Sequence, residues 1–404
     1  MDSDSTFLSD SSALVSESDE DDEAASSSQC PGMKTVKKRV RQNEYFAGKR
    51  YRCLRKISSG AFGKVYLGVN TQTSEQVGIK LESRNTDLLE NEYNVYLQIR
   101  DGIGIPNIRY FGKEGKYNAL VMDLLGPSLE GYFRFCESDF SIQTICLLAD
   151  QMIDRIEFLH SRGLIHRDIK PENFLTGLHE DSSTIFLVDY GLTKPFHEIV
   201  AGLQNRYARF DCFYGTMAFA SINALRNMPQ SKRDDIEAVG YCLLYFSIGD
   251  LPWYTIRDSD EETSKMVADS KAQMSISEIC PQMAYEFESY FDYCKYLRFS
   301  EEPDYKYLKS IFKKRYDSLN CTDNCFDWQP NMQWFSDHAP DTKMVVQKQK
   351  PQPKPKPKAK PKKRVQKKKV QIKKAPKKPS NKPSNKPSKK PSKKSIFSIP
   401  FWTR

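Results

Sequence analysis

The sequence predicts an α+β protein of two lobes, a small β-rich lobe followed by a larger α-helical one, between an acidic head and a basic tail. Three observations lead to this prediction. Short strand-like runs around a Gly/Ser turn occupy residues 51–123, whereas long helical patterns occupy residues 127–330. Residues 1–33 carry nine acidic and no basic side chains. Residues 342–404 carry 24 Lys and Arg and no acidic ones, and charge blocks of this kind stay solvated.

These changes divide the 404 residues into four segments. We predict a disordered, Ser-rich acidic head over residues 1–33, a basic lead-in over 34–50, one globular domain over 51–330 and a low-complexity tail over 331–404. Proline every few residues excludes helix from the tail, and lysine repulsion extends it as far as an apolar decapeptide, Ser395–Arg404.

Composition excludes several classes of protein. No apolar run reaches the ~18 residues of a membrane span, and the N-terminus lacks the basic and apolar regions of a signal peptide. The ten cysteines are scattered, and Cys321 and Cys325 have no second pair or nearby His to complete a zinc site. We therefore expect reduced thiols and an intracellular protein of the nucleus, the cytoplasm or both.

The small lobe is predicted to hold five strands and one helix. The helix is expected over residues 86–100, where Leu88, Leu89, Val95, Tyr96 and Ile99 approximate a period of 3.6 residues. The strands are expected over residues 51–57, 64–69, 76–82, 109–111 and 118–122.

Two helices organise the predicted large lobe. The first extends from Ser141, a suitable N-cap, to Arg162, and Gly163 is a suitable C′ residue. Its apolar stripe consists of Ile145, Leu148, Met152, Ile156 and Leu159. The second helix covers residues 234–248 and is apolar nearly all round, so we expect it at the centre of the lobe.

A Gly-rich hairpin in the small lobe is a candidate phosphate site. Its backbone N–H groups are open to a phosphate because glycine has no Cβ. Hairpins of this kind are common, so the motif is weak evidence by itself. Its residues are Ser58, Ser59, Gly60, Ala61, Phe62 and Gly63, with Ser58 in place of the first Gly of G-x-G-x-x-G.

Lys80, on the third predicted strand, is a second candidate. A lysine in an alternating strand usually points to solvent, but here Glu92 lies on the following helix. A pair of these two side chains would hold the ammonium against the α- and β-phosphates of ATP. Glu90 is the alternative partner on the same helix.

The strongest signal is an octapeptide, His166-Arg167-Asp168-Ile169-Lys170-Pro171-Glu172-Asn173. It follows the long helix and precedes a strand-like run at residues 184–188, after which comes Asp189-Tyr190-Gly191. In this pattern Asp168 accepts a hydroxyl proton, while Asn173 and Asp189 ligate Mg²⁺. The order and spacing are those of the H-R-D-x-x-x-x-N and D-F-G motifs of protein kinases, with Tyr190 in the Phe position.

The chain therefore resembles protein kinases, and within them the casein kinase 1 family. The resemblance covers residues 51–330, and the vaccinia-related kinases, which share some of the pattern, are the alternative branch. The most specific feature is Ala220-Ser221-Ile222-Asn223, which stands where most kinases have A-P-E. The other matching segments are 124–130 (LLGPSLE), 148–153 (LADQMI), 233–237 (RDDIE), 251–253 (LPW), 303–305 (PDY) and 326–328 (FDW).

The resemblance implies ATP and Mg²⁺ as cofactors and a role for each motif residue. Asp168 would accept the proton of the substrate hydroxyl, Lys170 would contact the γ-phosphate and is typical of a Ser/Thr kinase, and Asp235 would brace the catalytic loop. Asn173 and Asp189 would hold Mg²⁺, and Lys80 would pair with Glu92. The adenine slot would be lined by Ile57, Val65, Gly78, Met122, Leu125 and Leu175, with Asp123 and Leu125 in the hinge.

The resemblance also implies a monomeric kinase domain and protein substrates with acidic residues N-terminal to the Ser or Thr acceptor. Related kinases often prefer a substrate that is already phosphorylated three residues before the acceptor. Ala218 replaces the main Arg that binds this phosphate, whereas Arg257 stands where a second basic residue is expected. Gly78 replaces the usual Ala of the adenine roof.

The basic tail leaves three interpretations open: a solubilising extension, a nuclear-localisation or nucleic-acid-binding segment, or an anchor to an anionic membrane surface. For the whole chain, an active kinase is the leading hypothesis. A pseudokinase that only presents its tails is a second, against which the presence of Lys80, Asp168, Asn173 and Asp189 argues. A nucleic-acid-binding protein is the third.

Overall fold

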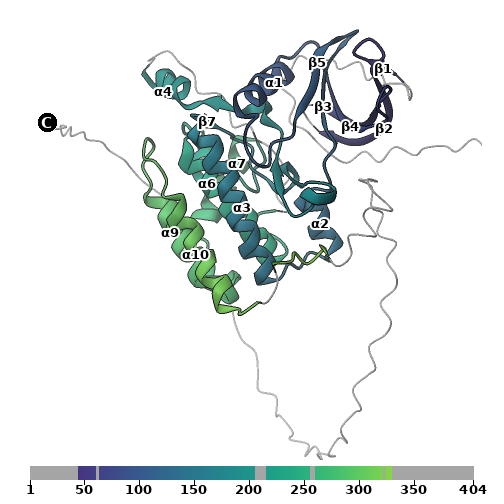
Figure 1. The fold of residues 1–404 in the computed structure, drawn as a ribbon. Helices are drawn as coiled ribbons and strands as arrows, with labels where there is room; N and C mark the ends of the chain where they lie inside the picture. Colours follow the sequence, from purple (N-terminus) through teal and green to yellow (C-terminus); the bar gives the residue numbers. More distant parts are fainter. Residues whose placement is uncertain (1–43, 61–62, 205–214, 255–259, 322–323, 330–404) are drawn as a thin grey trace, which may run out of the picture. The chain divides into compact units, whose positions relative to one another are not determined.

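The computed structural model describes residues 44–60, 63–204, 215–254, 260–321 and 324–329. The acidic head, most of the basic lead-in and the low-complexity tail lie outside these ranges, as do Ala61, Phe62 and Arg257. The described residues form a β-rich lobe followed by a helical lobe (Figure 1). The predicted α+β class and its two lobes are thus confirmed.

An antiparallel sheet of six strands makes up most of the small lobe, in the order β1-β2-β3-β4-β6-β5. This is one strand more than the sequence predicts. The additional strand lies in the basic lead-in and has two residues, which is too short to show an alternating pattern. The bounds are β1 (Tyr45–Phe46), β2 (Tyr51–Gly60), β3 (Gly63–Asn70), β4 (Gln76–Ser83), β5 (Ile108–Glu114) and β6 (Tyr117–Asp123).

The register of the sheet decides which side chains face the helix α1 (Leu88–Ile99). Lys80 of β4 pairs with Leu120 of β6, and Gly78 pairs with Met122. Because residues two apart in a strand share a face, these four lie on one side of the sheet. Leu120 belongs to the same core as the buried residues of α1, so this is the side that α1 covers. The other side forms a second core with Tyr51, Tyr66, Val77, Ile79, Leu81 and Val121.

The large lobe is built around one helix, α6. All residues from Asp234 to Phe246 in this helix are buried, which agrees with the prediction of a central helix that is apolar nearly all round; the acidic Asp234, Asp235 and Glu237 are buried with the rest. Helices α3 and α9 pack against it. The helices of this lobe are α2 (Leu129–Phe135), α3 (Ile142–Ser161), α4 (Phe196–Gln204), α5 (Ile222–Leu225), α6 (Lys232–Ile248), α7 (Glu261–Ala272), α8 (Ile276–Ile279), α9 (Ala284–Tyr296) and α10 (Tyr305–Ser318).

Helix α3 has the ends that the sequence predicts. The Ser141 hydroxyl accepts the backbone N–H of Thr144 at 3.1 Å, and Gly163 has a φ of +71° beyond the C-terminus. The predicted apolar stripe of α3 is buried throughout. The chain then passes through four short strands, β7 (Leu164–Ile165), β8 (Phe174–Thr176), β9 (Ile185–Leu187) and β10 (Lys194–Pro195), which frame the loops that carry the motif residues.

Candidate active site

Lys80 lies at the centre of a first group of charged side chains. Its Nζ is 2.6 Å from Glu92 Oε2 on α1 and 2.8 Å from Asp189 Oδ1, two residues after β9. Glu92 shares the buried face of α1 with Tyr96, four residues later, which directs its carboxylate toward the sheet. Of the two predicted partners, it is therefore Glu92, and not Glu90, that reaches Lys80.

The Lys80 ammonium lies between two carboxylates, and burial and the neighbouring charges shift the pKa of each of the three groups in a different way. Burial disfavours the charge on Lys80, but Glu92 and Asp189 outweigh it and raise its pKa. Burial raises the pKa of Glu92 to about 7 against the opposing effect of Lys80. Burial also acts against the charge on Asp189, but the Lys80 ammonium prevails and lowers the pKa of this carboxyl. Asp189 is therefore ionised at neutral pH, which a cation ligand requires.

A second group lies on the loop between β7 and β8. Lys170 Nζ is 2.6 Å from Asp168 Oδ2, and the Asn173 side-chain amide donates to the Asp168 backbone carbonyl at 2.8 Å. A 3₁₀ turn over Pro171–Asn173 returns the chain so that Asn173 can reach back. The octapeptide thus brings together its three candidate site residues, Asp168, Lys170 and Asn173.

Asp235, in the buried first turns of α6, holds this loop. Its carboxylate accepts the backbone N–H groups of His166 at 2.7 Å and Arg167 at 2.9 Å, and it lies 2.9 Å from His160 Nε2. Burial opposes its charge, but the contact with His160 and the other donors prevails and lowers its pKa. An ionised carboxylate can accept all these bonds at once, which is the geometry that a brace of the loop needs.

Backbone strain marks both groups. Arg167, next to Asp168, has a φ of +73°, and Asp189 has a φ of +68°. Non-glycine residues in this region are uncommon, and each costs roughly 1–3 kcal/mol unless its surroundings impose it. Here the bond from Arg167 N–H to Asp235 and the bond from Lys80 to Asp189 hold the two residues in place. Residue types alone do not predict such conformations.

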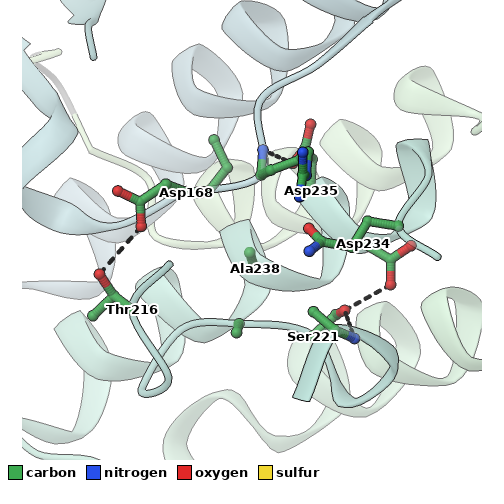
Figure 2. A pocket seen from close by; sticks show the side chains of 11 residues that line it. Asp168, Thr216, Ser221, Asp234, Asp235 and Ala238 are labelled. Carbon is green, nitrogen blue, oxygen red and sulfur yellow. Dashed lines mark hydrogen bonds between the residues drawn. The ribbon is translucent and has the colours of Figure 1, made fainter. Parts of the chain in front are cut away.

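Thr216 completes the surroundings of Asp168. It lies on the segment before α5, and its hydroxyl donates to Asp168 Oδ1 at 3.2 Å (Figure 2). Each carboxylate oxygen of Asp168 therefore has a partner, Lys170 on one side and Thr216 on the other. The sequence reasoning assigned no role to Thr216, and the available signal was its position five residues before Ser221 of the A-S-I-N segment.

The Gly-rich hairpin is formed by the ends of β2 and β3. Ser58, Ser59 and Gly60 pair with Val65, Lys64 and Gly63. A Cβ on Gly63 would lie 2.8 Å from the Leu81 carbonyl oxygen, so the close approach of β4 requires glycine there. Ala61 and Phe62, at the tip, lie outside the described residues.

The residues predicted for the adenine slot lie on neighbouring elements. Ile57 is at an irregularity in β2, next to the pair Ser58–Val65. Met122 and Asp123 end β6, and Leu125 follows two residues later. Leu175, on β8, forms a bridge with Ser128, so the chain after β6 runs beside β8. The Asp123 carboxylate accepts Arg109 Nε at 2.6 Å and the Asn107 side-chain amide at 2.7 Å, so its side chain is engaged with the β5 side of the sheet.

Comparison with known protein families shows which family this chain belongs to. The family model described as the protein kinase domain matches residues 51–325. The chain belongs to the protein kinase family. It is therefore a phosphotransferase domain of a family that uses ATP, a divalent metal ion and protein substrates. Within the described part of this kinase, none of the helices has the length and apolar character that crossing a membrane requires.

The oxygen donors of this kinase fit a hard divalent cation. Asp189 supplies an ionised carboxylate, and the bond from Asn173 Nδ2 to Asp168 leaves the amide oxygen of Asn173 as a donor. Magnesium takes oxygen ligands and is commonly held by one or two protein side chains together with substrate phosphates and water. Asn173 and Asp189 would therefore hold the metal, which neutralises phosphate charge when it is bound.

Proposed function

We propose that this kinase transfers the γ-phosphoryl group of Mg-ATP to Ser and Thr hydroxyls of protein substrates. The hydroxyl oxygen forms a bond to the γ-phosphorus, and its proton passes to the Asp168 carboxylate. The bond between the γ-phosphorus and the β–γ bridging oxygen breaks, so that ADP leaves. Lys170 faces the same carboxylate and would contact the transferred phosphoryl group.

One observation carries the Ser/Thr assignment: Asp168 lies between Lys170 and Thr216. Burial disfavours the charge on Lys170, but Asp168 outweighs it and raises its pKa, so the ammonium is available to the phosphoryl group. The bond from Thr216 keeps the segment that begins there close to the base. A lysine two residues after this aspartate, as Lys170 is here, is what the resemblance associates with Ser/Thr kinases.

The nucleotide would lie between the two groups of charged side chains. Lys80, oriented by Glu92, would contact its α- and β-phosphates under the backbone of the hairpin over residues 58–63. The Gly78 and Met122 face of the sheet, with Ile57, Val65, Leu125 and Leu175, would enclose the adenine.

We also place the kinase in the casein kinase 1 family, on the basis of Ala220-Ser221-Ile222-Asn223 and the other matching segments. This placement carries the proposed preference for acidic residues N-terminal to the acceptor, and we expect a monomeric kinase domain. The basic tail adds a proposed anionic partner, which is a nucleic acid or a membrane surface. We expect the protein in the nucleus, the cytoplasm or both.

Peptide pools test this function. Three pools, with Ser, Thr or Tyr as the single acceptor among randomised positions, are incubated with the kinase and labelled Mg-ATP. We expect label in the Ser and Thr pools, strongest when Asp or Glu precedes the acceptor. Label in the Tyr pool alone would contradict the Ser/Thr assignment, and no label in any pool over a range of Mg²⁺ concentrations would favour a pseudokinase that only presents its tails.

A further inference from the structure

Lys271 on α7 is a buried basic residue that the reaction described above does not use. It is 3% exposed. Its Nζ donates to the backbone carbonyls of Met217 at 3.1 Å and Ala220 at 2.5 Å. The ring centre of Tyr241 lies 4.0 Å from the same nitrogen, and that of Trp253 lies 5.2 Å away. The ammonium is thus enclosed by two carbonyls and two aromatic faces, which are both favourable partners of a cation.

The carbonyls that Lys271 contacts belong to the segment Thr216–Ser221. The first residue of this segment contacts Asp168, and the last donates its hydroxyl to Asp234 Oδ1 at 2.6 Å (Figure 2). Between these two ends, Trp253 Nε1 donates to the Ala218 carbonyl at 2.8 Å. Two side chains from outside the segment therefore hold three of its carbonyls.

Burying Lys271 carries a desolvation cost that an apolar residue at this position would not have. Glu237 of α6 is the acidic group that faces it, and its Oε1 accepts the Ile222 backbone N–H and the Tyr241 hydroxyl, each at 2.9 Å. Burial lowers the pKa of Lys271 to about 7 and raises the pKa of Glu237 to about 7. An apolar side chain of similar length would avoid this desolvation cost. The contacts with the segment are what an apolar side chain could not provide.

We propose that Lys271 is a positioning residue for the protein substrate. By holding the carbonyls of Met217 and Ala220, it keeps the segment Thr216–Ser221 against the catalytic loop and forms the surface beside Asp168 on which the acceptor segment lies. The inference rests on the proposed function, since it requires a peptide acceptor at Asp168. Lys271 makes no contact with Lys80, Glu92 or Asp189, so nucleotide binding is independent of it.

The test compares Lys271→Met, which keeps the chain length and removes the donors, with Lys271→Arg, which keeps charge and donors. Lys265→Met is the matched control, because Lys265 lies on the same helix, is exposed and pairs with Glu261. We expect Lys271→Met to lower kcat/KM for a Ser peptide about ten- to hundredfold, mainly through KM for the peptide. KM for ATP and the affinity for an ATP analogue should stay at the wild-type values. Lys271→Arg should recover part of the loss, and Lys265→Met should match the wild type.

The outcomes separate this inference from the proposed function. A wild-type protein that phosphorylates no Ser or Thr peptide refutes the proposed function. An active wild type with an equally active, folded Lys271→Met refutes only the positioning role. A folded Lys271→Met that binds the ATP analogue more weakly as its peptide KM rises refutes it too. If Lys271→Met does not fold, Lys271→Leu, which is shorter and also has no N–H donor, is measured instead, and a wild-type peptide KM in this folded variant overturns the proposal.

Discussion

Gly78 leaves room for a methyl group at the roof of the proposed adenine slot. A Cβ there would lie 3.5 Å from Met122 Cγ and 3.6 Å from the Asp123 carbonyl oxygen, which is ordinary van der Waals contact. We predict that Gly78→Ala raises the free energy of unfolding by roughly 0.4–1 kcal/mol, because the unfolded chain loses conformational freedom. The added methyl should strengthen ATP binding by at most ~0.8 kcal/mol. Urea unfolding and nucleotide titration measure the two effects.

Gly63→Ala is the matched control for this prediction. Here the new Cβ would meet the Leu81 carbonyl oxygen at 2.8 Å, so the strand pair must shift and the variant should be less stable than the wild type. A Gly78→Ala protein that is destabilised as much as Gly63→Ala would show that the roof of the slot has no spare room.

Because residue 218 is an alanine and not an arginine, we predict that the wild type has only a weak preference for phosphorylated substrates. Its carbonyl is held by Trp253, but its side chain cannot bind a phosphate, and the exposed Asp250 adds negative charge to the chain nearby. We predict that Ala218→Arg increases the preference for phosphoserine over Asp, three residues before the acceptor, by ~10- to 150-fold, the value of one charge-assisted contact. Rates with matched peptides that carry phosphoserine, Asp or Ala at this position measure the preference.

Arg257→Ala is the companion variant, at a position outside the described residues. It should remove the remaining preference for phosphoserine. A wild type that already prefers phosphoserine strongly, and that Arg257→Ala does not change, would show that another basic patch binds the phosphate.

At the scale of elements, the contact between β4 and α1 depends on pH through Glu92. Because burial raises the pKa of this carboxyl to about 7, it takes up a proton as the pH falls through neutrality and its attraction for Lys80 weakens. We predict that kcat/KM for Mg-ATP declines below pH 7 in the wild type. Glu92→Gln should have a lower and flatter profile over the same range, and any titration of ATP itself is common to both proteins. Parallel profiles would exclude Glu92 as the titrating group.

Stability should change in the opposite direction. The folded pKa of Glu92 lies above its unfolded value, so its contribution to stability is present below the unfolded pKa and is lost as the pH rises through about 7. Thermal unfolding of the wild type and Glu92→Gln between pH 5 and 8 measures this, and the difference between them should vary only in this window. The ion pair of Glu92 with Lys80 is thus suited to orienting the lysine, and it does not maximise the stability of the fold.

Across the whole molecule, sequence periodicity predicts the elements and motif order predicts the charged groups. The caps of α3, the buried α6 and the partner of Lys80 are examples, because capping, burial and spacing are local properties. The strand β1 has two residues and no pattern. The role of Lys271 and the positive φ of Arg167 could not be predicted, since each depends on a contact between segments far apart in the sequence.

The charge division of the chain predicts that its catalytic and anion-binding activities are separable. A chain that ends at residue 341 loses 24 Lys and Arg and no acidic residue. It should no longer be retained on DNA or heparin, whereas peptide phosphorylation should be nearly unchanged, and retention of the full chain should fall steeply with salt. Equal retention of both forms would assign the anion-binding surface to the kinase domain.

The central claim is that Asp168 accepts the hydroxyl proton during phosphoryl transfer, and Asp168→Asn tests it most directly. The amide keeps the shape of the side chain but cannot take up the proton. We predict that kcat for a Ser peptide falls by about 10²–10⁴-fold while the affinity for a Mg-ATP analogue stays within about threefold of the wild type. A variant with wild-type kcat and intact nucleotide binding would contradict the account.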